Sequence, residues 1–160
     1  MALNRMMHPR NPYKDKPPNF RALAEKYDDF RSHCSVGPDG KIYINFRDTD
    51  AVRALSRVLL HNDFGLTVEL PPDCLVPRIP QKLNYVLWID DLLKLNGITD
   101  NVTGIDIGTG ASCVYALLGA KQCGWHFVAT DADKFAFEVI EESYVILGLI
   151  YLVFAVYRIL

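Results

Sequence analysis

Apolar residues recur at helical spacing near the start of the chain, behind a candidate helix cap. Phe20, Leu23, Ala24 and Tyr27 fall three or four positions apart, so they would share one face of an α-helix. Asn19 precedes them and is of the residue type that accepts hydrogen bonds from the first free backbone N–H groups of a helix. This pattern predicts a helix that begins at about Phe20.

A second, longer helical pattern follows a predicted turn and strand. GPDGKIYINF places turn-forming residues before an alternating apolar run, which indicates a turn that leads into a strand. Asp48 can cap the next helix, and Gly65 can end it. We expect one apolar face on this helix, made of Val52, Leu55, Val58 and Leu59.

A third helix is predicted after a short strand, LTVEL, and a crossing punctuated by proline, PPDCLVPRIP. Its sequence is LNYVLWIDDLLKLN, and helical spacing predicts an inward face made of Tyr85, Trp88, Ile89 and Leu92. Residues 19–101 therefore form a helix-rich N-terminal section.

The spacing of apolar residues changes at Val102. VTGIDIG is a short apolar run, GASCVYALLGAKQC a helical stretch, and HFVATD a second apolar run. Strand, helix and strand in this order predict a parallel sheet covered by helices, in which ligands bind outside the carboxyl ends of the strands. Residues 102–143 are therefore interpreted as the first part of an α/β domain.

Composition narrows the class of protein. The 160 residues suffice for about one domain, and half of them are apolar. The net charge of −2 argues against a chain that is basic throughout, so any nucleic-acid surface would be local. The four cysteines show no metal-site spacing, and the first residues lack the apolar core of a secretory signal. These features predict no zinc site, a reducing compartment and a start in the cytosol or nucleus.

Residues 1–18 differ from the rest because they carry four prolines. Residues 1–21 hold five basic side chains and one acid. Fixed proline angles and repulsion between like charges predict an extended basic arm. Either this arm contacts nucleic acid or it is a solvated, disordered tail.

The stretch GIDIGTGAS is the strongest candidate for a binding site. Asp106, Gly108 and Gly110 fall where the first strand ends, and Asp131 ends the second strand, 23 residues after Gly108. Glycines allow a ligand to approach the main chain, and an acid at this spacing can accept hydrogen bonds from ribose hydroxyls. Cys113 replaces the last glycine of the dinucleotide fingerprint, which disfavours a nicotinamide cofactor. S-adenosylmethionine, close to Asp106 and Ser112, fits better, and a purely structural turn remains the alternative.

Several blocks of the chain resemble one known family. NPYKDKPPNF, NFRDTDAVRAL, LLHNDFGL, PQKLNYVLWIDDLL and GIDIGTGASCVYALLGA are similar to the N-terminal half of the methyltransferase-like protein sixteen family, from Met1 to about Phe137. The resemblance implies an incomplete class I, Rossmann-like methyltransferase domain preceded by the helix-rich section. It also implies S-adenosyl-L-methionine as donor and the exocyclic amine of adenosine, in U-six small nuclear RNA or mRNA hairpins, as target. We therefore expect a nuclear protein with an additional cytoplasmic pool.

The resemblance also assigns residues. The family's cofactor positions fall on Lys82, where relatives have arginine, and on Gly108, Ser112 and Asp131, the last replacing a usual glutamate. It also places Pro17, Pro18, Asn19 and Phe20 in a family segment at the RNA surface. The neighbouring basic residues Arg10, Lys14 and Lys16 would neutralise phosphates there.

One expected element is absent from the 160 residues. The family holds the target amine with Asn-Pro-Pro-Phe after a fourth strand, and this motif does not occur here. No catalytic residue is therefore assigned, and a non-catalytic cofactor- or RNA-binding remnant is the alternative function. From Gly104 onward there is room for two strands and two helices.

The end of the chain, residues 144–160, is an apolar tail that differs from the family. It has 14 residues without a charge before Arg158. A membrane span needs about 20 apolar residues, so we expect buried core instead, with a membrane anchor as the weaker alternative. An alternative exon in a truncated isoform is the hypothesis for its origin.

Overall fold

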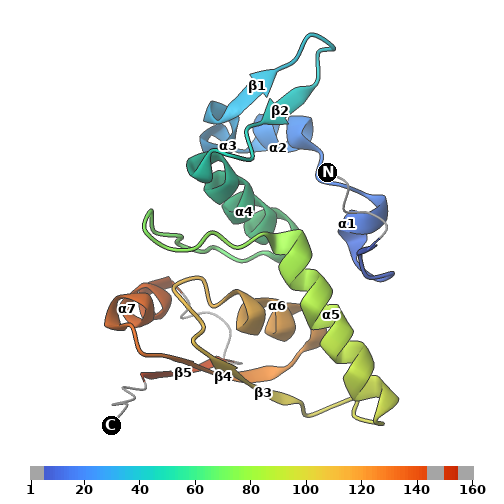
Figure 1. Cartoon of the computed structure of the whole chain (residues 1–160), viewed down its shortest axis with the longest axis vertical. Coiled ribbons are helices and arrows are strands. Elements are labelled where there is room, and N and C mark those ends of the chain that lie inside the picture. Colours follow the sequence, from blue (N-terminus) through green and yellow to red (C-terminus); the bar gives the residue numbers. More distant parts are fainter. Residues whose placement is uncertain (1–5, 144–149, 155–160) are drawn as a thin grey trace.

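The computed structural model describes residues 6–143 and 150–154 of the chain. Helices and a hairpin occupy the first hundred residues, and a small α/β unit follows (Figure 1). The elements in chain order are α1 Pro12–Asp15, α2 Phe20–Lys26, α3 Asp28–Ser32, β1 Cys34–Val36, β2 Ile42–Ile44, α4 Thr49–Phe64, α5 Ile79–Leu95, β3 Thr103–Ile107, α6 Val114–Cys123, β4 His126–Asp131, α7 Lys134–Ser143 and β5 Ile150–Phe154.

The predicted caps of the first two long helical patterns are confirmed. The side chain of Asn19 accepts from the backbone N–H of Ala22, and that of Asp48 accepts from the N–H of Asp50 at 2.9 Å. Gly65 ends α4 in the left-handed conformation with φ 65°, which costs glycine less than any residue with a Cβ. Local chemistry therefore sets where these helices begin and end.

The LTVEL segment has the predicted alternation of buried and exposed residues but does not form a paired strand among the described residues. Leu66, Val68 and Leu70 are buried and the residues between them are exposed, as alternation predicts. The segment nevertheless pairs with no strand in the described part of the chain, because its apolar side chains pack into the core of the helices.

Residues 6–18 of the basic arm are packed, contrary to the prediction of an extended chain. Met7 and Tyr13 are buried, and Asn11 is only 1% exposed. Asn11 Nδ2 donates to the Pro80 carbonyl at 2.9 Å and to Asn84 Oδ1 at 2.7 Å. The short helix α1 then begins at Pro12, a residue that suits a first helical turn. Buried apolar side chains and long-range hydrogen bonds fix this segment despite its prolines.

The inward face predicted for α5 is wrong except for Ile89, which is partly buried against the core. Tyr85 is 49% exposed and Trp88 is 52% exposed, and Leu92 lies on the surface as well. The inward stripe is instead Ile79, Leu83, Val86, Leu87 and Asp90. Because α5 is apolar on more than one side, its sequence fits several stripes, and packing against α4 and α6 selects among them.

The α/β unit contains a parallel sheet with strand order β3-β4-β5. Ile105 pairs with Val128, and Val128 with Tyr151, so β5 from the apolar tail forms a third strand where the sequence predicted two. Helices α6 and α7 lie on the same side of the sheet (Figure 1), as two crossovers of the same hand require. The tail is therefore continuous with the sheet over residues 150–154, while residues 144–149 and 155–160 lie outside the described residues.

The other side of the sheet is open in the described structure. Ile105 and Ile107 of β3 are 69% and 73% exposed. Parallel sheets normally carry helices on both faces, so this unit is half of a doubly wound arrangement. No described helix is long and apolar enough to cross a membrane.

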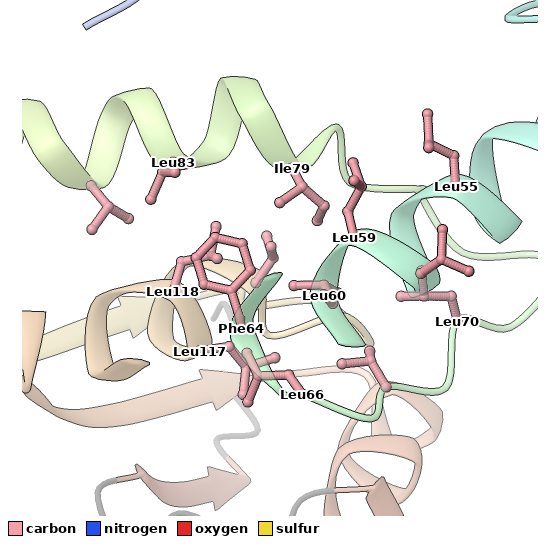
Figure 2. Packing of buried hydrophobic residues seen from close by; sticks show 14 of the residues in the cluster. Leu55, Leu59, Leu60, Phe64, Leu66, Leu70, Ile79, Leu83, Leu117 and Leu118 are labelled. Carbon is pink, nitrogen blue, oxygen red and sulfur yellow. The ribbon is translucent and has the colours of Figure 1, made fainter. Parts of the chain in front are cut away.

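One core joins the helical section to the α/β unit. Figure 2 shows leucines of α4 and α5 packed against Leu117 and Leu118 of α6. Leu60, Ile79 and Leu83 are fully buried in this cluster. The two predicted sections are therefore a single cooperative packing unit, with α5 as the element that contacts both.

Candidate cofactor site

The candidate site lies at the carboxyl ends of β3 and β4. β3 ends at Ile107 and α6 begins at Val114, so residues 108–113 form the loop between them. The backbone N–H groups of Gly108 and Thr109 both donate to the Thr130 carbonyl, at 2.8 and 3.0 Å. These bonds hold the loop against the end of β4, where Asp131 is the last residue.

Two glycines give this loop its shape. Gly108 has φ 71° and Gly110 φ 64°, a left-handed conformation that glycine adopts without steric cost. A Cβ at either position would meet no heavy atom within 4 Å. The loop therefore presents bare main chain to open space, the arrangement a closely approaching ligand requires.

Asp131 ties the glycine loop to the second strand. Its Oδ2 accepts from the N–H of Gly110 at 2.7 Å, and its Oδ1 accepts from the N–H of Asp133 at 2.8 Å. A carboxylate oxygen has two lone pairs, so each oxygen keeps the capacity to accept a hydroxyl donor. The structure brings together the predicted Asp106, Gly108, Gly110 and Asp131.

The remaining loop residues differ in their surroundings. Asp106 Oδ2 accepts from Thr109 Oγ1 at 2.7 Å, and Ser112 is half-buried in the same loop. Cys113 is fully buried with φ 43°, and burial raises the pKa of its thiol to about 12. A thiol with that pKa is protonated at neutral pH, so Cys113 is a small core residue and not a nucleophile.

Lys82 reaches this region from α5. Its Nζ donates to Tyr115 Oη at 2.9 Å and lies 4.5 Å from the centre of the same ring. Tyr115 is in the first turn of α6, three residues after Ser112. Thr109 and Tyr115 were not predicted as site residues, although Thr109 lies inside GIDIGTGAS and Tyr115 follows it by three residues.

The glycines of the loop do not line the cavity beside β3. A cavity of about 450 Å³ lies between α5 and β3 and is lined mainly by apolar residues, including Tyr85, Ile89 and Phe127. Of the predicted cofactor residues it contacts only Asp106. The glycines and Asp131 instead border open solvent at the end of the sheet.

The predicted RNA residue Arg10 is already paired with carboxylates. Its guanidinium donates to Asp90 at 2.7 Å and also to Asp91, and His8 Nε2 lies 2.8 Å from Asp91. Burial would lower the pKa of Arg10, but the hydrogen bonds and charges of Asp90 and Asp91 raise it. Arg10 therefore holds the arm on α5, which argues against the predicted phosphate contact.

The other predicted RNA residues form a surface segment. Lys16 and Pro17 are exposed, and Lys14 and Pro18 are half-buried. The side chain of Asn19 caps α2, and Phe20 packs edge-on against Phe30 with ring centres 6.0 Å apart. Asn19 and Phe20 therefore have structural roles, and the two lysines present the positive charge.

This geometry by itself defines a class of protein. A strand, a glycine loop, a helix and a second strand ending in an acid form the nucleoside-binding start of a Rossmann-like fold. A family model described as RNA methyltransferase matches residues 1–146, and the chain belongs to that family. A Caenorhabditis elegans protein, "U6 small nuclear RNA (adenine-(43)-N(6))-methyltransferase", is 55% identical over 143 residues.

Solved structures agree with the family. The N-terminal domain of human METTL16 in complex with SAH has a TM-score of 0.86 and 44% identity, covering 95% of this chain and 60% of that one. The human catalytic domain in complex with MAT2A 3'UTR hairpin 6 has a TM-score of 0.85 and 44% identity, covering 95% and 54%. The fold is therefore an incomplete Rossmann-like methyltransferase domain. The match to the C. elegans protein covers 89% of this chain but only 30% of the relative.

Proposed function

We propose that this chain provides the donor-binding and RNA-binding part of an RNA adenosine N6-methyltransferase that uses S-adenosyl-L-methionine. The observation that carries the proposal is the contact between Gly110 and Asp131, which places a carboxylate beside bare main chain at the ends of two parallel strands. A nucleoside fits this arrangement because the glycines admit it and the acid can bind its two sugar hydroxyls.

Each predicted cofactor residue has a role in this proposal. Asp131 would accept from the ribose, and Gly108 and Gly110 would leave room for the donor beside the loop. Lys82 would neutralise the donor carboxylate, held in place by Tyr115. Asp106, with Ser112 nearby, would favour the cationic end of the donor. When bound, S-adenosylmethionine supplies a methyl group on a positively charged sulfur.

RNA binding is proposed for the surface that carries Lys14 and Lys16. Lysines on an exposed segment neutralise phosphates and release counterions, so this binding would weaken as salt rises. A catalytic domain similar to this chain is described in complex with an RNA hairpin. We therefore propose an RNA with a hairpin as partner. Nuclear localisation, with a cytoplasmic pool, is proposed because one relative's named substrate is a small nuclear RNA.

The proposal names residues that bind the donor and the RNA, but no residue that orients the target amine. Asn-Pro-Pro-Phe does not occur in the 160 residues. The relatives are named as methyltransferases, which supports the enzyme over a second candidate, a chain that binds donor and RNA without turnover. Incubation with labelled donor and a small nuclear RNA hairpin separates the two, because incorporation of label by the purified chain supports the enzyme and its absence supports the binding chain.

Donor binding is tested by calorimetric titration with S-adenosylhomocysteine. We expect binding by the parent chain and a loss of at least about tenfold in affinity for Asp131→Ala, which corresponds to about 1.4 kcal/mol. Asp100→Ala is the matched control, because Asp100 is an exposed acid that precedes β3, at the opposite end of this strand from the glycine loop. Equal affinity of Asp131→Ala and the parent would remove Asp131 from the site.

A further inference from the structure

A second, larger cavity lies in the N-terminal section, on the side of the chain where the arm folds back. Its volume is about 720 Å³, within the range of roughly 300 to 1,000 Å³ typical of ligand pockets. The arm, the strand β2, α4 and the start of α5 all contribute to its lining, which includes Tyr13, Pro17, Pro18, Phe20, Phe46 and Ile79. The segment assigned to RNA by family resemblance therefore borders this cavity.

Aromatic rings lie at the solvent edge of the cavity. Phe46 is 41% exposed although it lines the cavity, and Tyr43 beside it is exposed too. Phe20 supports Phe46 with ring centres 6.3 Å apart, and Tyr43 Oη donates to Asp39 at 2.9 Å, which orients its ring. Held rings with an open face are platforms on which unpaired bases stack.

One cation lines the cavity, and others follow its lining residues in the chain. Arg78 lines the cavity, Arg47 follows Phe46 in the chain, and Lys14 follows Tyr13. Within residues 6–143 and 150–154, none of these three side chains forms an ion pair, and the same holds for Lys16. Asp15 lies between Lys14 and Lys16 in the chain, whereas two other acids have partners elsewhere: the side chain of Asp48 caps α4, and that of Asp39 binds Lys41.

We propose that this cavity accepts one unpaired base of the bound RNA, stacked on Phe46, with Arg78 and the arm lysines on the flanking phosphates. An apolar pocket lined by Arg78, with further cations next to its lining residues in the chain, suits a flat, weakly polar base attached to a charged backbone. A base inside a duplex is covered by its neighbours, so the site selects RNA with a nucleotide outside the helix. The inference rests on the proposed RNA-binding function and identifies how that RNA is distinguished from a plain duplex.

The test uses a labelled RNA hairpin with one unpaired nucleotide replaced by 2-aminopurine, whose fluorescence falls when it stacks. The parent chain should quench this fluorescence and bind the hairpin about tenfold more tightly than the same stem without unpaired nucleotides. Phe46→Ala should abolish quenching and lower affinity about tenfold, and Phe46→Tyr should restore both. Trp88→Ala is the matched control, because Trp88 is an exposed ring on α5 that does not line the cavity.

A second variant keeps the test independent of folding. Arg78 is exposed and its side chain makes no hydrogen bond to the described residues, so Arg78→Ala should fold like the parent and bind the hairpin several-fold more weakly, with a shallower dependence on salt. Thermal unfolding checks that both variants fold.

The outcomes separate this inference from the proposed function. If the parent binds the hairpin but Phe46→Ala and Arg78→Ala bind it equally well and still quench, the base pocket is wrong and the RNA-binding function stands. If the parent binds no RNA, the RNA part of the proposed function fails together with the pocket, whereas donor binding is judged separately by the titration with S-adenosylhomocysteine. Binding of an apolar peptide in this cavity, with an affinity that does not change with salt, would also overturn the assignment.

Discussion

Gly110 links the shape of the glycine loop to its proposed use. It adopts φ 64°, and its N–H donates to Asp131. A residue with a Cβ in this conformation costs roughly 1 to 2 kcal/mol. The same Cβ would point into the open space that a ligand is proposed to fill.

We therefore predict that Gly110→Ala lowers the free energy of unfolding by about 1 to 2 kcal/mol and also weakens binding of S-adenosylhomocysteine. Gly40→Ala is the matched control, since Gly40 has φ 72° and equally open space but lies in the hairpin turn. Gly40→Ala should lose a similar free energy of unfolding and keep its affinity for S-adenosylhomocysteine. Urea unfolding and calorimetry measure the two effects, and an equal loss of affinity in both variants would contradict the placement of the ligand.

At the same scale, single residues show where sequence reasoning succeeds. Asp106, Gly108, Gly110 and Asp131 were predicted together from spacing alone, because their positions depend on one short loop and two strand ends. Arg10 was assigned to RNA from its charge, but its partners Asp90 and Asp91 are about 80 positions away. Pairing over that distance is decided by the packing of the arm on α5, which no local pattern encodes.

At the scale of elements, the arm is fastened to α5 by a cluster of charges. Asp90 is buried, and Arg10 and Lys94 both donate to its Oδ2. Burial would raise the pKa of Asp90, but the hydrogen bonds from Lys94 and Arg10 lower it. The pKa of Asp91 is likewise lowered, mainly by its hydrogen bond with His8.

The pKa shifts determine how this contact depends on pH. A carboxylate whose folded pKa lies below its unfolded value of about 3.9 stabilises the fold above that value, and the contribution is lost as pH falls through the folded pKa. We predict that Asp90→Asn lowers the free energy of unfolding by about 1 to 3 kcal/mol at pH 7, with a smaller difference from the parent below about pH 4. Urea unfolding across pH measures this, and a difference that does not change with pH would show that charge plays no part.

The helix α5 shows why an element can be predicted while its orientation is not. The helix was predicted from Leu83, but it begins four residues earlier, at Ile79, with Pro80 in its first turn. Its inward face was assigned to Tyr85 and Trp88, which are half exposed. Helical periodicity selects a face only when the other faces are polar, and α5 has apolar residues around much of its circumference.

At the scale of the whole molecule, one core makes the helical section and the α/β unit interdependent. Leu60 of α4 is fully buried in the cluster that includes Leu117 and Leu118 of α6 (Figure 2). We predict a single unfolding transition, and a loss of about 2 to 5 kcal/mol for Leu60→Ala. Far-ultraviolet circular dichroism and fluorescence of Trp125 in the α/β unit should report the same midpoint. Two separate midpoints would show that the sections fold independently.

The open side of the sheet is a second property of the whole molecule. β3 is at the edge of the described sheet, and Ile105 and Ile107 are exposed. Exposed apolar edge strands favour pairing between chains. We predict that Ile105→Thr combined with Ile107→Thr reduces self-association measured by sedimentation velocity, with little change in the unfolding midpoint. Leu117→Ala is the contrast, because a buried leucine should lower that midpoint. Unchanged association in the double variant would show that this edge is not the contact.

The sequence by itself determined the features that depend on neighbouring residues: the helix caps, the αL glycines and the strand, loop and helix around Gly108. It also indicated the family and the carboxylate that ends the second strand. Tertiary structure alone decided that the arm packs, which side of α5 is buried, that residues 150–154 extend the sheet and that Arg10 pairs with α5. These outcomes depend on contacts between segments far apart in the chain, where the burial of apolar surface and the pairing of buried charges outweigh local preference.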